Sequence, residues 1–185
     1  PIDGRYFPIP AGDLDTLSAA IGPEIWSLAN DANDKVSRRA IAVLQSIKPS
    51  KAQRDQVAGF VLDEGQRSTV RKAWLRWLRK QDLALFTSVG VKALYSKSPE
   101  LRVVAAQELT EAKQGRSAVN SYLLATLKNS GDTVELQRAI KMVPRLPSKK
   151  SIIEQLVKEL IAGRSAPDIQ LEVLETATTA MRDYT

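Results

Sequence analysis

Residues 99–109 read PELRVVAAQEL, and they carry the pattern that decides the fold. Leu101, Ala105 and Leu109 recur every four residues, which places them on one face of a helix. Ala106 widens that face, so the stripe follows i, i+4, i+5 and i+8. Four other segments have the same stripe, with Glu135 as the one clear departure from apolar or small side chains. The central residues of the five segments are Ala40, Trp74, Ala105, Ala139 and Val173. Their spacing predicts an internal repeat of about thirty-three residues.

A second apolar stretch precedes each of these segments, so every repeat is expected to hold two helices. The five stretches span residues 25–29, 57–62, 83–95, 119–127 and 152–161. Turn chemistry separates the helices, with Ser98 as an expected N-cap. Ser50 with Gln53, and Asp132 with Glu135, have the spacing of a capping box. One helical pair cannot bury its own apolar face, so neighbouring pairs must stack. We therefore predict an all-α fold, a right-handed α-α superhelix of about five helical pairs.

The segments that carry the stripe share an opening in which an acid or proline precedes an apolar residue beside a basic one. A small residue and then an aliphatic residue follow. The clearest examples are Pro99-Glu100-Leu101-Arg102 before Ala105 and Leu109, Val70-Arg71 before Trp74 and Leu78, and Asp34-Lys35-Val36 before Ala40 and Leu44. This order resembles the second helix of HEAT-like repeats over about 155 residues. The resemblance implies a HEAT-like solenoid whose second helices line a concave surface. Tetratricopeptide repeats have a similar period, but their Trp-Leu-Gly-Tyr opening is absent here.

Residues 1–22 precede the repeats. Three prolines, together with Tyr6 and Phe7, favour an extended arm over residues 1–10 that packs on the first repeat. Residues 13–21 are expected to add a capping helix. Residues 23–185 then form a single repeat domain. Because the chain starts without a methionine, we expect it to be a segment of a larger multidomain protein. No apolar run approaches the length of a membrane span.

The composition excludes much catalytic chemistry. The chain has no cysteine and no histidine, which removes thiolate nucleophiles, imidazole bases and the usual zinc ligands. Six carboxylates at predicted turns have capping as their commonest role: Asp31, Asp34, Asp63, Glu64, Asp132 and Asp168. Some HEAT-like proteins are DNA glycosylases with a catalytic aspartate beside aromatic residues, which the resemblance leaves as a less favoured alternative. We predict that the chain is not an enzyme and holds no cofactor or metal.

Basic residues outnumber acidic ones by 27 to 21, so the net charge of +6 favours an acidic partner. Between Arg67 and Lys80 the cations and the two indoles fall on opposite sides of a helix, which predicts that Trp74 and Trp77 are core residues. The cations expected to line the concave face are Arg38, Arg39, Arg71, Lys72, Arg76, Arg102, Arg138 and Lys141.

This basic set predicts a non-catalytic interaction or scaffold module that binds a protein partner through its concave face. Nucleic-acid binding through the same cations is the main alternative, since several contacts to phosphates give strong affinity. Pro144 and Pro147 interrupt the fourth second helix. They predict either a bend that shapes a ligand groove or a simple early stop. Oligomeric state and compartment stay open.

Overall fold

A computed structural model of the chain describes residues 22–146 and 149–182. These residues are all-helical and contain no strand. After a helical stretch at residues 22–28, the α-helices are α2 (Asp34–Leu44), α3 (Lys51–Leu62), α4 (Ser68–Gln81), α5 (Leu83–Ala93), α6 (Pro99–Glu111), α7 (Arg116–Asn129), α8 (Thr133–Met142), α9 (Lys149–Ile161) and α10 (Pro167–Arg182). Apart from Gly22, the predicted arm and capping helix lie outside the described residues. None of the described helices is long and apolar enough to cross a membrane.

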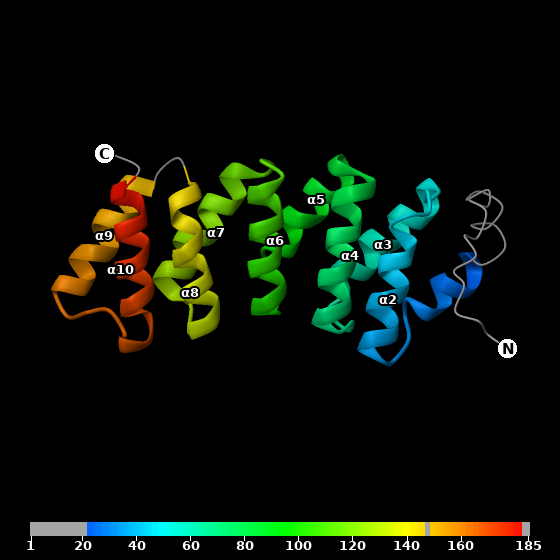
Figure 1. Cartoon of the computed structure of the whole chain (residues 1–185), viewed down its shortest axis with the longest axis horizontal. Coiled ribbons are helices and arrows are strands. Elements are labelled where there is room, and N and C mark those ends of the chain that lie inside the picture. The colour runs from blue at the N-terminus through cyan, green and yellow to red at the C-terminus, as the bar shows by residue number, and fades with distance from the viewer. Residues whose placement is uncertain (1–21, 147–148, 183–185) are drawn as a thin grey trace, which may run out of the picture.

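The helices form two rows along the long axis of the molecule (Figure 1). In one row, α2, α4, α6, α8 and α10 each contact the next member. In the other row, α3 contacts α5, and each helix of this row packs on the helix that follows it in the chain. Residues 22–28 and α10 stand at opposite ends of the two rows (Figure 1). The alternation of helices predicted from the apolar stretches is confirmed.

The repeat centres lie in the interior. Each of the five central residues is at most 6% exposed. The residues four positions later, from Leu44 to Ala177, are buried as well. Burial of these stripes removes apolar surface from water at about 25 cal/mol per Å², so the stripes hold the helices together. Leu174 departs from the pattern and is 53% exposed, because α10 is the last helix of the described part of the chain and nothing covers its outer side there.

The tryptophans form an aromatic centre near the start of the array. Trp74 and Trp77 of α4 are fully buried, as the helical pattern predicts. The ring of Trp26 stacks on Trp74 with 5.4 Å between centroids, and Trp77 meets Trp74 edge-on at 5.6 Å. Phe60 of α3 completes the group at 6.4 Å from Trp74. Offset and edge-on pairs of this kind add stability beyond buried area.

Local signals set most helix ends. Ser50 and Gln53 form the predicted capping box with both hydrogen bonds, and the side chain of Ser98 caps α6. Asp132 accepts from the backbone N–H of Glu135 at 2.7 Å, but the side chain of Glu135 does not return to the cap. The capping box predicted there is therefore only half formed. Helix α8 stops early and passes into the 3-10 turn η1 (Val143–Arg145) that contains Pro144.

Candidate binding surface

The exposed side of the row α2, α4, α6, α8 and α10 is the candidate binding surface, and we call it the second-helix face. All eight cations predicted to bind a partner belong to helices of this row. They do not share one environment. Four pair with a carboxylate on the next helix of the row, one is buried, and three form no direct ion pair within the described ranges.

Ion pairs link each helix of the row from α4 onward to the next. Lys72 of α4 pairs with Glu100 of α6, and the hydrogen bond lowers the pKa of that carboxyl. Further along the same two helices, Arg76 and Arg79 both bind Glu108, at 2.8 and 2.6 Å. Lys141 of α8 lies 3.8 Å from Glu172 of α10. We call this series, together with the pair of Arg102 and Glu135, the inter-helix ladder.

Arg71 lies in the interior, although the helical pattern placed it among the surface cations. Its side chain is 2% exposed. Its Nε donates to the carbonyl of Val61 at 2.8 Å, and both terminal nitrogens bind Glu64, at 2.9 and 3.0 Å. The hydrogen bond from this guanidinium is the main reason that the pKa of Glu64 falls to about 2. Arg71 thus fixes the turn between α3 and α4, and each of its three side-chain nitrogens already donates to an acceptor in that turn or in α3.

Glu135 is the centre of a buried polar network between α6, α7 and α8. It is 2% exposed and binds Arg102 through two nitrogens, at 2.7 and 2.6 Å. The hydroxyls of Tyr122 and Ser130 also donate to it, at 2.8 and 2.9 Å. Burial by itself would raise the pKa of Glu135, but these hydrogen bonds outweigh burial and lower it. Burial, and then Glu135, raise the pKa of Tyr122. A carboxylate held this firmly in its charged form is a poor proton carrier.

The sequence contains one sign of this network, but the helical period alone does not identify the partner of Glu135. Glu135 interrupts an otherwise apolar stripe, and a buried charge requires a partner. The partner is Arg102, which stands 33 residues earlier in the chain and on another helix. Only the packing of α6 against α8 brings the two together.

The remaining predicted cations are Arg38, Arg39 and Arg138, and none of them forms a direct ion pair in the part of the chain that the structure describes. The charge of Arg138 nevertheless helps to lower the pKa of Glu100. Arg39 borders a groove of about 420 Å³ between residues 22–28 and α2. Lys35 also borders it. The rest of its lining is apolar: Ile25, Leu28, Val36, Ala40 and Val43. We call this the α2 groove.

Acid-base and metal chemistry have little support in the described residues. Asp34 accepts from Thr69 at 2.7 Å and pairs with Arg67, and Asp132 caps α8. Among the described residues, no three acidic side chains gather closely enough to hold a metal ion. A scan against protein-family models matched nothing, and searches of curated proteins and of solved structures found no similar protein. The function must therefore be inferred from the chain's own residues.

Proposed function

We propose that the chain is a right-handed α-α superhelix of HEAT-like pairs and acts as a non-catalytic module that docks a protein partner on its second-helix face. The spacing of the repeat centres and the burial of all five support the repeat architecture. The contacts of each second helix with the next support a continuous row. A row of this kind offers a long surface that suits an extended protein segment better than a small substrate.

The observation that carries the proposal is the α2 groove, which lies at the end of the second-helix face, where residues 22–28 meet α2. Its floor is apolar, and Lys35 and Arg39 stand on its border. Arg38 is exposed on the same helix, and its Nε donates to the backbone carbonyl of Asp34, at 3.2 Å. An apolar centre with charged surroundings is the usual anatomy of a protein interface. The partner that complements it carries an apolar side chain flanked by carboxylates.

The inter-helix ladder makes the nucleic-acid alternative less favourable. Binding to a phosphate backbone draws its affinity from cations that release counterions. Five of the eight predicted cations already pair with carboxylates of the same chain: Arg71, Lys72, Arg76, Arg102 and Lys141. A phosphate would have to displace these carboxylates, and leaving a buried one without its partner is costly. Of the predicted set, only Arg38, Arg39 and Arg138 form no direct ion pair within the described residues.

Selection from a random peptide library tests this function. The wild-type chain should enrich peptides with an apolar residue between acidic ones. The double variant Arg38→Glu with Arg39→Glu should lose those peptides, because it reverses the charge beside the groove. A matched control, Lys92→Glu with Lys128→Glu, makes the same charge change on exposed residues of α5 and α7 and should keep them.

Titrating the same proteins with duplex and single-stranded DNA at two salt concentrations distinguishes protein docking from nucleic-acid binding. We expect no binding at near-physiological salt. Strong, salt-dependent DNA binding that Arg38→Glu with Arg39→Glu abolishes would replace the proposal with the nucleic-acid function. A library that yields no enriched motif, or the same motif in wild type and double variant, would also overturn it.

A further inference from the structure

The exposed side of α10 carries two leucines. Leu171 is 63% exposed, and Leu174 is also largely uncovered. At about 100° per residue the two leucines share one side of the helix, opposite the buried side chains of Ile169 and Val173. The terminal unit of a helical array normally has a polar outer face that keeps it soluble. The outer side of α10 instead has the apolar character of an interface.

Two carboxylates flank these leucines. Asp168 lies one helical turn before Leu171, and Glu175 lies one turn after it. Both carboxylates are exposed, and neither forms a direct ion pair in the part of the chain that the structure describes. Glu172 differs, because its side chain is largely covered and pairs with Lys141 of α8. The surface that we call the α10 face therefore consists of Asp168, Leu171, Leu174 and Glu175.

The α2 groove complements the α10 face in both shape of chemistry and charge. Leu28 and Val43 of its apolar floor are exposed, so they have surface left to bury. Lys35 and Arg39 on its border are exposed as well. The leucines of the α10 face can therefore enter the floor while its carboxylates meet the two cations. Opposite charges across an interface select the partner and fix its orientation.

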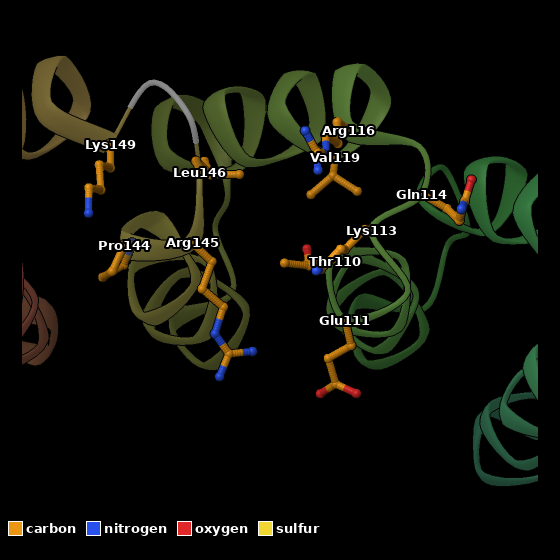
Figure 2. A pocket seen from close by; sticks show the side chains of 10 residues that line it. All are labelled: Thr110, Glu111, Lys113, Gln114, Arg116, Val119, Pro144, Arg145, Leu146 and Lys149. Atoms are coloured by element: carbon orange, nitrogen blue, oxygen red, sulfur yellow. The ribbon is translucent and has the colours of Figure 1, made fainter.

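A larger hollow, of about 710 Å³, lies between the turn from α6 to α7 and the turn η1, but its lining does not suit the α10 face. Figure 2 shows that the side chains lining it from both sides are mostly polar or charged. Its apolar lining is limited to Val119, Pro144 and Leu146. The α2 groove has five apolar side chains and two cations, so leucines bury more apolar surface there.

The α2 groove and the α10 face belong to opposite ends of the molecule (Figure 1). In the row of second helices, α4, α6 and α8 each have a row neighbour on both sides. Within the described residues, α2 has one such neighbour, α4, and α10 has one, α8. A second copy placed end to end would give both outer helices the neighbour that they lack.

Charge also favours this arrangement over a symmetric dimer. Two α2 grooves placed against each other would bring Lys35 and Arg39 of one copy close to the same cations of the other. Two α10 faces would bring Asp168 and Glu175 close to the same carboxylates. Like charges across an interface weaken binding. Only the pairing of a groove with an α10 face places opposite charges together.

We propose that the chain associates head to tail, with the α10 face of one copy docked in the α2 groove of the next. This inference rests on the proposed function, because it takes the α2 groove as a docking site and names a second copy as the partner. Each contact uses two different surfaces, so a free groove remains at one end and a free α10 face at the other. Further copies can therefore add at both ends.

Sedimentation velocity of the full chain tests this contact. The weight-average sedimentation coefficient of the wild type should rise between about 10 μM and about 1 mM. Leu171→Asp with Leu174→Asp disrupts the α10 face, and Arg38→Glu with Arg39→Glu reverses the charge beside the groove. Each double variant alone should self-associate about tenfold more weakly or less. An equimolar mixture should restore wild-type affinity but stop at a 1:1 dimer, because one variant keeps an intact groove and the other an intact α10 face.

Leu83→Asp with Leu124→Asp is the matched control, since it introduces the same charges at exposed leucines of α5 and α7. These positions belong to neither surface, so the control should associate within about twofold of the wild type. Formation of the mixed dimer also shows that both test variants are folded, because an unfolded chain would offer neither an intact groove nor an intact α10 face.

A wild-type chain that stays monomeric over this range would overturn the inference. A mixture that fails to dimerise while the wild type associates would also overturn it, since the contact would then be symmetric or lie elsewhere. An equal loss in the control would show a general effect of added charge. Peptide selection by a monomeric wild-type chain would remove this inference alone, whereas the absence of both peptide selection and association would remove the proposed function as well.

Discussion

At the scale of single residues, Glu135 shows how one polar side chain can be accommodated in an apolar stripe. The equivalent position holds Val70 in α4 and Leu101 in α6, both buried. Glu135 occupies this interior place at low cost because Arg102, Tyr122 and Ser130 all donate to its carboxylate. A buried charge is tolerated when its partner and its hydrogen bonds are complete.

Removing the cation of this network should be costly. Arg102→Leu leaves Glu135 buried without its counter-charge, and we expect a loss of about 3–5 kcal/mol in the free energy of unfolding. Arg76→Gln is the matched control, because Arg76 is 53% exposed and Glu108 keeps its bond to Arg79. The control should cost less than about 1 kcal/mol. Urea unfolding followed by tryptophan fluorescence measures both, and similar losses would contradict the role given to the buried pair.

Glu64 should make stability depend on acid pH. Its pKa is about 2 in the folded chain and 4.5 in its ordinary state, so the folded form binds its proton less readily. The stability it contributes is complete above pH 4.5 and is lost as the pH falls toward 2. Glu64→Gln should flatten this part of the stability curve, measured by urea unfolding at a series of acid pH values. Parallel curves for wild type and variant would rule out this contribution.

At the scale of the helix, two glycines separate the effect of helix propensity on stability from the effect of side-chain packing. Gly59 lies in α3 where a Cβ would point into open space, whereas a Cβ at Gly90 of α5 would lie 3.1 Å from Cδ2 of Leu109. Gly59→Ala should stabilise the chain by about 0.5–1 kcal/mol, because alanine loses less backbone entropy in a helix.

Gly90→Ala is the comparison for Gly59→Ala, since it offers the same gain in helix propensity. Its methyl group must displace the buried side chain of Leu109, so we expect a net loss of about 1 kcal/mol. Thermal unfolding by circular dichroism measures both variants. Equal shifts of the melting temperature in one direction would show that the close approach of α5 to Leu109 does not matter.

At the scale of the whole molecule, stability should be distributed unevenly along the rows. The main core extends from Ala29 to Ile152 and includes the aromatic group on α4. At the C-terminal end a separate cluster has three buried members, Ile140, Ile169 and Val173. Helices that contact neighbours on one side only can open without disrupting the rest.

Native-state hydrogen exchange should show this difference. We expect the amides of α9 and α10 to exchange through openings of lower free energy than those of α4 and α6. The reason is that α9 and α10 contact each other, α8 and η1, whereas α4 contacts helices on both sides. One common free energy of exchange for all four helices would mean that the chain unfolds as a single unit.

The sequence by itself determined the helices, their alternation and the interior face of each. The burial of Trp74 and the capping box of Ser50 followed from local periodicity and turn chemistry. Those features depend on residues within a few positions of one another, so a linear pattern contains them.

The tertiary structure alone decided which charges are available. Arg71 is buried, and Arg102 meets Glu135. Arg102 and Glu135 lie 33 residues apart in the chain and meet only because helices of successive pairs stand side by side. Helix periodicity shows on which face of its own helix a side chain lies. It does not show which helix packs against that face, or which residue of that helix the side chain meets. A cation that reads as a free surface charge can therefore be an internal ion pair.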